Sequence, residues 1–204
     1  EAVVMLTALA RFFRISLSKG SNIIPIGDEI EHARNYLTIQ KMRYKNKFSA
    51  DISAEPGIEK LYTIKLIIQP ILENAIYHGV NGLVDEGHIE IRVRAEGEDV
   101  LFMVEDNGVG MEPEQIEEIF RRKPDGKSGI GIKNVNDRLK IWFGDAYGIT
   151  IESVPDEGTK VTVRMPKAGM SSSRSSASKA MLAEMHSLRR ISSPSMSALG
   201  SASA

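Results

Sequence analysis

The chain has 204 residues, 42% of them hydrophobic, and its 26 lysines and arginines nearly balance 27 acidic residues, for a formal net charge of −1. This length predicts one main domain with some appended structure, and the small charge excludes a bulk attraction to nucleic acid or to an anionic membrane. The absence of cysteine excludes disulfides, thiolate metal sites and cysteine nucleophiles.

The sequence carries no membrane or export signal that we can recognise. No apolar run reaches the ~18–20 residues that a membrane-spanning helix needs. The first residues, EAVVMLTALARFF, lack the basic lead and cleavage pattern of a signal peptide. They also begin without methionine, so we expect the chain to be a piece of a larger protein.

Two helices are predicted in residues 1–45. In the first, over residues 1–18, the apolar positions recur every three to four residues and cover a wider arc than one neighbouring helix would bury. Glycines and a proline in SKGSNIIPIG end it. Asp28 followed by Glu31 resembles a capping box, which predicts that the second helix runs from there to about Tyr44.

The following 120 or so residues mix strands and helices. KFSADIS alternates like a strand, and residues 61–78 read as a buried helix in which Pro70 predicts a kink. HIEIRVRAEG and DVLFMVEDNG predict an antiparallel hairpin that ends at Asp106. A short helix near residues 113–120, a helix after GIGI with Val135, Leu139 and Trp142 inward, and the strands GITIESV and GTKVTVRMP complete the domain.

From Lys167 onward the chain is rich in serine and alanine and too poor in large apolar residues to form a core. We interpret residues 168–204 as a tail, either disordered or added during cloning. The predicted organisation is therefore a helical segment over residues 1–45, a main domain over residues 46–167 and this tail.

The sequence element DNGVGM predicts one end of a nucleotide site. In DNGVGM, Gly108 and Gly110 let the backbone approach a planar ligand, and the Asp106 carboxylate can accept a hydrogen bond from the exocyclic amino group of adenine. Guanine has a carbonyl there and would lose roughly 1–3 kcal/mol. Taken alone, DNGVG is equally explained as an ordinary turn.

GIGI predicts the other end of that site. Gly129 and Gly131 precede a helix whose first amides and dipole favour an anion, and two cations, Lys127 and Lys133, lie near. A lone pair of glycines before a helix is weak evidence, but its order after DNGVGM favours a phosphate cradle.

The helical stretch PILENAIYHG sets Glu73 and Asn74 among apolar residues. A bound triphosphate needs Mg²⁺, which prefers oxygen ligands, so Asn74 can offer its carbonyl oxygen and Glu73 can orient a metal-bound water. Taken alone, Asn74 is also explained as a hydrogen-bonded core amide and Glu73 as a solvent-facing side chain. All three elements in this order favour the nucleotide site.

LENAIYHG, DNGVGM and GIGIKNVNDRL resemble the N, G1 and G2 boxes of the GHKL ATPase superfamily. With IPIGDEIEHARNYLTIQKMRY and LIIQPILENAI, they more narrowly resemble the LytS-type sensor histidine kinases of bacterial two-component systems, over nearly all of residues 1–166. The resemblance implies an α+β fold, a two-layer α/β sandwich of the Bergerat type. Its mixed, mainly antiparallel sheet would be covered by helices on one face, with ATP beneath a lid at residues 111–128.

The resemblance also implies residue roles. Asn74 would be the Mg²⁺ ligand, Asp106 the adenine-reading carboxylate and Thr159 a support of the adenine site. Tyr77 departs from the family, which commonly has a lysine there, and His78 matches a histidine that contacts phosphate or serves the structure. The glycines would form the adenine-side and phosphate turns, at Gly108, Gly110, Gly129 and Gly131.

The activity implied is transfer of the ATP γ-phosphoryl group to a histidine and then to an aspartate of a response regulator. The family's acceptor lies in a PHFLFN-like motif that does not occur here, so we expect the chain to lack its own acceptor, and His32 is not that residue. The resemblance implies ATP, Mg²⁺, a response regulator and, in the full kinase, a second copy as partners. It also implies that this chain is a cytoplasmic part of a membrane-bound bacterial parent. Neither a nucleic-acid partner nor direct contact of this chain with the membrane is expected.

One alternative is excluded and two stay open. A gyrase- or chaperone-like ATPase needs a glutamate base one helical turn before Asn74, where this chain has Pro70, which cannot act as a base. A protein-serine kinase of the anti-sigma-factor type shares the three boxes. A module that docks without catalysis would tolerate Tyr77 and the missing acceptor. The signal sensed and the identity of the regulator stay open from sequence.

Overall fold

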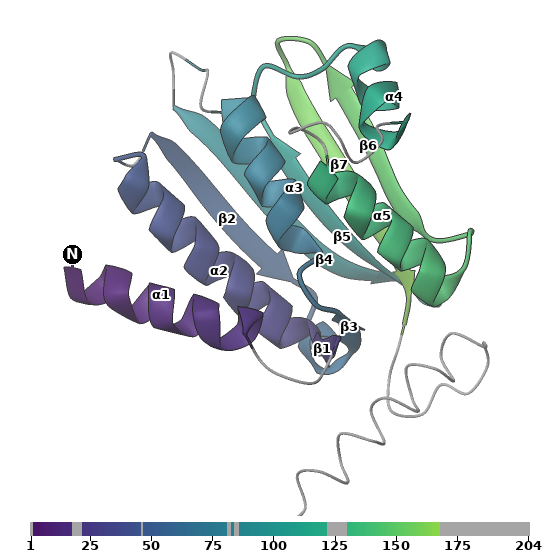
Figure 1. The fold of residues 1–204 in the computed structure, drawn as a ribbon, viewed down its shortest axis with the longest axis horizontal. Helices are drawn as coiled ribbons and strands as arrows, with labels where there is room; N and C mark the ends of the chain where they lie inside the picture. The colour runs from purple at the N-terminus through teal and green to yellow at the C-terminus, as the bar shows by residue number, and fades with distance from the viewer. Residues whose placement is uncertain are drawn as a thin grey trace, which may run out of the picture.

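The computed structural model describes residues 2–17, 22–45, 47–80, 83, 86–121 and 130–167, and the predicted tail lies outside them. A five-stranded sheet forms one layer and helices cover one of its faces (Figure 1). This is the predicted two-layer α+β arrangement. Within these ranges no helix is long and apolar enough to cross a membrane.

The strand order of the sheet is β2-β4-β5-β7-β6. β2 runs parallel to β4, and the other neighbouring pairs are antiparallel. The sheet is therefore mixed and mainly antiparallel, as predicted. The strands are β2 (Phe48–Ala54), β4 (Gly87–Glu96), β5 (Asp99–Asp106), β6 (Gly148–Val154) and β7 (Gly158–Pro166).

Alternating side chains decide which face of the sheet is buried. On β5, Val100, Phe102 and Val104 are buried beneath the helices. Since successive side chains of a strand point to opposite faces, Asp106 continues this inward series and Glu105 points to the other face. The strand thereby carries one carboxylate into the interior at its end.

The helices are α1 (Ala2–Ser16), α2 (Ile26–Arg43), α3 (Ile68–Asn74), α4 (Pro113–Arg121) and α5 (Ile130–Phe143). α2, α3 and α5 lie side by side over the sheet, and α1 lies outside them against α2 (Figure 1). A π turn, η2 (Ala75–Gly79), continues α3, a short 3-10 turn η1 (Ile58–Lys60) follows β2, and β1 (Ile23–Pro25) pairs with β3 (Tyr62–Ile64).

The predicted capping box at the start of the second helix is wrong. α2 begins two residues earlier, at Ile26, with Pro25 as its N-cap and no side-chain capping bond. Pro25 is restricted to a backbone conformation that suits the residue before a helix, so the chain enters α2 without a carboxylate cap. Glu31 instead lies 3.5 Å from the guanidinium of Arg14 on α1.

The predicted helix over residues 61–78 is wrong in its first third, and the predicted kink at Pro70 is wrong. The chain forms β3, turns at Leu66 with a positive φ of 59°, and begins α3 at Ile68. Pro70 is thus in the first helical turn, where an N–H has no partner within the helix and its loss costs nothing. The irregularity lies at the other end, in the π turn.

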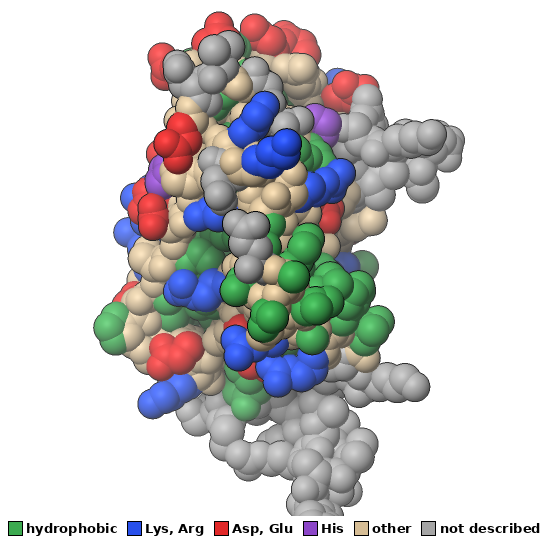
Figure 2. Space-filling view, turned by 90° about the vertical axis from the view of Figure 1, so that its left-hand side faces the viewer, with side chains coloured by type: hydrophobic (Ala, Val, Ile, Leu, Met, Phe, Trp, Pro, Cys, Tyr) green, Lys and Arg blue, Asp and Glu red, His purple; other side chains and the backbone are tan. Residues whose placement is uncertain are grey.

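α2 belongs to the same hydrophobic core as the sheet. Ile26, Ile30 and Leu37 are buried in one cluster with side chains of α3, α5 and the central strands. α1 in contrast buries Ala8 and Ile15, whereas Val3 and Leu6 on α1 and Leu17 just after its end are between 67% and 76% exposed. Figure 2 shows hydrophobic side chains gathered on this side of the molecule. The predicted excess of apolar surface on the first helix is confirmed.

Candidate functional site

Asp106 is a buried carboxylate at the end of β5, only 6% exposed. Its Oδ1 accepts a 2.9 Å hydrogen bond from the amide of Gly108, and the backbone of Thr159 is a second donor. Burial nevertheless raises its pKa to about 6, since these bonds only partly offset desolvation. A buried acceptor held this way is poised to bind a donor on a ligand.

Glycines bring the end of the N-box helix, which consists of α3 and its continuation η2, onto the carboxylate of Asp106. A Cβ at Gly108 would overlap the Cα of Gly79, and a Cβ at Gly79 would lie 2.6 Å from Asp106 Oδ1. Gly110 has a φ of 65°, and a Cβ there would overlap the carbonyl oxygen of Val154. The sequence analysis did not single out Gly79. Its position as the last residue of the LENAIYHG motif is the signal that could have identified it.

Thr159 faces Asp106 across the β5–β7 ladder and is also buried. Its hydroxyl lies 2.8 Å from that of Ser153, which donates its only proton to the carbonyl of Gly158. Thr159 must therefore donate to Ser153, which leaves lone pairs on its own oxygen for a ligand. Ser153 also accepts a 2.8 Å bond from the amide of Met111, and sequence reasoning missed this residue.

The N-box helix presents two different faces. Residues four apart lie on one side, so Pro70, Asn74 and His78 form one stripe, and Pro70 faces Gly131 in the first turn of α5. Asn74 is half-buried and His78 exposed. Among the described residues no hydrogen bond occupies the side chain of Asn74, so its carbonyl oxygen is available.

Glu73 lies on the other stripe, toward α2. Its Oε1 accepts a 2.8 Å bond from Gln69, and its charge raises the pKa of the buried Tyr36, though burial of that phenol is the larger cause. One turn later the Tyr77 hydroxyl accepts a 2.7 Å bond from Arg43. The bond to Gln69 occupies only one of the two carboxylate oxygens, so the role predicted for Glu73, orienting a metal-bound water, stays a prediction.

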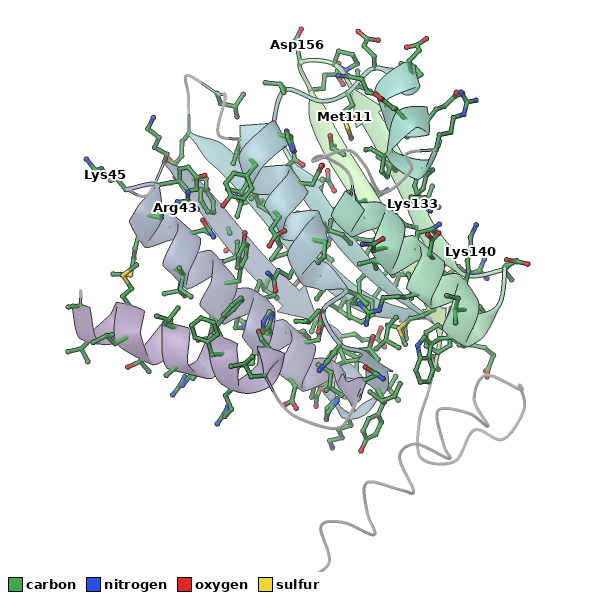
Figure 3. All side chains as sticks on the ribbon, viewed as in Figure 1. Arg43, Lys45, Met111, Lys133, Lys140 and Asp156 are labelled. Atoms are coloured by element: carbon green, nitrogen blue, oxygen red, sulfur yellow. The ribbon has the colours of Figure 1, made fainter. Side chains whose placement is uncertain are left out.

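The first turn of α5 lies beside this helix. Gly131 was predicted to precede α5, but α5 begins at Ile130, so Gly131 is its second residue, and a Cβ there would lie 2.9 Å from Pro70 Cβ. Lys133, labelled on α5 in Figure 3, lies two residues after Gly131. Its Nζ is 2.5 Å from Oδ2 of Asp137. Lys127 and Gly129 lie outside the described residues.

A hollow of about 200 Å³ lies at the ends of β5, β6 and β7, and Asp106 and Thr159 belong to its lining. Glu105, Glu152 and Lys160 also line it, and these residues are paired across the strands on the face that points away from the helices. The hollow therefore opens on the outer face of the sheet.

The donor set fits a weakly held hard cation rather than a cage. No group of three or more histidine, cysteine or acidic side chains that could hold a metal occurs in the part of the chain that the structure describes. Mg²⁺ is commonly bound through one or two protein oxygens, substrate phosphates and water, and the side chain of Asn74 carries an oxygen of this kind.

The sequence matches two family models. One, for histidine kinase-, DNA gyrase B- and HSP90-like ATPases, covers residues 60–169. The other, for histidine kinases, covers residues 1–48. The chain belongs to the histidine kinase-, DNA gyrase B- and HSP90-like ATPase family. The GHKL resemblance drawn from the three boxes is thereby confirmed.

Sensor histidine kinases are among the relatives of this ATPase-family chain. Sensor histidine kinase BtsS of Escherichia coli K12 is 34% identical over 166 residues, which are 81% of this chain and 28% of the relative. The sensor protein LytS of Bacillus anthracis is 30% identical over 170 residues, 82% of this chain and 29% of the relative. The LytS-type resemblance is confirmed, and the chain spans under a third of these relatives.

Solved structures support the fold. The histidine kinase domain of the blue-light-activated kinase EL346 of Erythrobacter litoralis superposes with a TM-score of 0.51 at 18% identity, over 81% of this chain and 74% of that one. The catalytic domain of histidine kinase ThkA gives 0.52 at 18% identity, over 71% and 94%. The predicted fold class is confirmed.

Proposed function

We propose that this chain is the ATP-binding catalytic part of a LytS-type sensor histidine kinase. The observation that carries the proposal is the buried carboxylate of Asp106, held by Gly108 and set opposite Thr159. An acceptor in this setting recognises an amino group and rejects a carbonyl, which favours adenine over guanine.

The phosphate end of the site would be the first turn of α5, where it lies against α3. The first amides of α5, with the helix dipole, would bind the phosphates, and Lys133 would contribute a cation on release from Asp137. Lys127, Gly129 and His78 are the further proposed phosphate contacts. Asn74 would hold Mg²⁺, whose charge, when it is bound, offsets that of the phosphates.

The reaction is in-line phosphoryl transfer. The bond between the γ-phosphorus and the β–γ bridging oxygen breaks and ADP leaves with the electron pair. The unprotonated nitrogen of a neutral histidine bonds to phosphorus through its lone pair, and the proton on the other ring nitrogen passes to solvent. The residues of this chain position the nucleotide and neutralise its charge. The acceptor histidine would belong to a separate segment, and an aspartate of a response regulator would receive the group next.

Residues 1–45 would serve assembly and residues 46–167 catalysis. The exposed apolar face of α1 would pack against a second copy of the kinase, because so much apolar surface on one helix is costly in water. We further propose that the parent is a membrane-bound bacterial sensor with this part in the cytoplasm.

The test is a calorimetric titration with ATP and Mg²⁺, with GTP as the control, followed by incubation with γ-labelled ATP. We expect binding of ATP but not GTP, and no stable label on the chain. Failure to bind ATP even with Mg²⁺ would contradict the proposal and favour a docking module.

The chemistry of any label separates the remaining alternatives. Acid-labile label on this chain would mean that the acceptor has been misplaced, and His32 and His78 would be replaced first. Acid-stable label on a protein serine would favour the serine kinase.

A further inference from the structure

α2 contains a carboxylate with no access to solvent. Glu29 is 0% exposed, and its oxygens accept hydrogen bonds from three successive backbone amides. Oε2 binds the amide of Leu66 at 2.8 Å, and Oε1 binds those of Ile67 and Ile68 at 2.7 and 2.9 Å. These amides lead into α3, so a residue of α2 satisfies the free N–H groups at the start of the N-box helix.

The turn that receives Glu29 is strained. Leu66 has a φ of 59°, a left-handed conformation that L-residues other than glycine, asparagine and aspartate seldom adopt. Such a conformation persists where surrounding contacts impose it. Three bonds from one buried carboxylate supply that constraint.

α5 is tied to the same turn. Arg138 donates a 2.7 Å bond to the carbonyl of Lys65 and attracts the Glu29 carboxylate. Burial raises the pKa of Glu29, while the three amides and Arg138 oppose that rise by favouring the ionised form. Only the ionised carboxylate offers acceptors alone, which is what three amide donors require.

This junction lies at the opposite end of α3 from the metal ligand. Asn74 follows Ile68 by six residues, or about 9 Å along a helix. Between them, Pro70 abuts Gly131 at the start of α5. The position of Asn74 relative to the phosphate-binding turn of α5 therefore depends on how the junction sets α3 and α5.

We propose that Glu29 is a positioning residue through which α2 sets the phosphate end of the nucleotide site. A displacement of α2 would move the start of α3, and with it Asn74 and the first turn of α5. The adenine end would move less, because Asp106 and Thr159 belong to the sheet and the N-box helix touches the carboxylate of Asp106 through Gly79, at the far end of η2. This inference rests on the proposed function, since it concerns the geometry of ATP binding.

The test is the Glu29→Gln variant. The glutamine nitrogen would face the Leu66 amide, donor against donor, and the charge that attracts Arg138 would be lost. We expect affinity for ATP with Mg²⁺ to fall about tenfold, the size of a typical coupling between sites. Adenosine affinity, followed by NMR at the Gly108 amide, should stay within twofold.

Two further variants keep the test decisive. Arg138→Met removes the bond to Lys65 while leaving the buried carboxylate, and it should show the same selective loss if Glu29→Gln folds poorly. Val93→Ala trims a buried side chain of β4, away from the junction. It destabilises the chain and should leave both affinities unchanged.

The inference is overturned if Glu29→Gln and Arg138→Met bind ATP with Mg²⁺ as tightly as the unaltered chain. It is equally overturned if adenosine and ATP weaken to the same extent, since that marks a general loss of structure. A failure of the unaltered chain to bind either ligand is a different result, which rejects the proposed function itself.

Discussion

The role in nucleotide binding that we propose for Asp106 opposes its effect on stability. Its carboxylate loses hydration on folding, and two backbone donors do not restore it fully. An amide of the same shape would cost less to bury, because it carries no charge. The ligand donor that would compensate the carboxylate comes with the nucleotide.

Replacement of Asp106 by asparagine should therefore abolish detectable ATP binding without lowering the melting temperature at pH 7. The asparagine oxygen can still accept from Gly108, but its amide group presents donors to the adenine amino group. Calorimetry and thermal melts check the two parts. Glu105→Gln, on the neighbouring outward-facing position, is the matched control and should bind ATP normally. A marked loss of stability in Asp106→Asn would contradict this account.

Asp106 also predicts opposite pH trends for binding and stability. Its folded pKa of about 6 exceeds the ordinary value of 3.8, so the folded state takes up the proton first. ATP affinity should fall as pH decreases through 6. The free energy of unfolding should gain, from this group alone, on the order of 2–3 kcal/mol between pH 7 and pH 4.

The contribution of His32 to stability has the opposite pH dependence, since burial lowers its pKa from 6.5 to about 4. The folded state favours neutral His32, so this contribution is lost as the pH falls below 6.5. The contribution of Asp106 must therefore be measured as a difference between the unaltered chain and Asp106→Asn, in urea unfolding at pH 7 and pH 5. A difference that does not change with pH would refute the assigned pKa.

At the scale of elements, the contact of α3 with α5 is set by the absence of a side chain. Gly131→Ala would place a methyl group 2.9 Å from Pro70 Cβ and push the start of α5 away. ATP affinity should fall about five- to tenfold, a modest coupling loss. Stability should change little, since alanine favours a helix by about 1 kcal/mol over glycine.

Calorimetry and melts on Gly131→Ala check this expectation. Lys140→Ala, an exposed change near the other end of α5, is the control and should bind as the unaltered chain does. Unchanged ATP affinity in Gly131→Ala would mean that the close packing does not serve the site.

The same elements mark what sequence could predict. Period-two alternation predicted each strand of the hairpin and the position of Asp106 at the end of the second one, because this pattern depends on neighbouring residues only. The start of α3 could not be predicted, since Leu61, Leu66 and Ile67 fit a helix equally well and the deciding contact comes from Glu29, 37 residues before Leu66. In the sequence, Glu29 cannot be distinguished from any other acidic residue in the first turn of a helix.

At the scale of the whole molecule, α1 carries the surface that would join two copies. Leu6→Glu should reduce self-association measured by sedimentation, because a charge would be buried in an apolar contact. ATP binding should be unaffected. Ile141→Glu is the matched control, since Ile141 is 82% exposed on α5, away from α1. Equal sedimentation of the two variants and the unaltered chain would contradict assembly through α1.

The core shared by α2 and the sheet has a consequence for how such proteins can be recombined. The family models divide the chain between residues 48 and 60. α2 precedes this division, yet it packs in the core of the domain that follows and caps the start of α3 there. A chimaera joined there would pair α2 of one parent with α3 of another and mismatch the buried carboxylate with its turn. A crossover between α1 and β1, before Ile23, would instead keep the junction intact, so the segments that precede Ile23 should be exchangeable between parents.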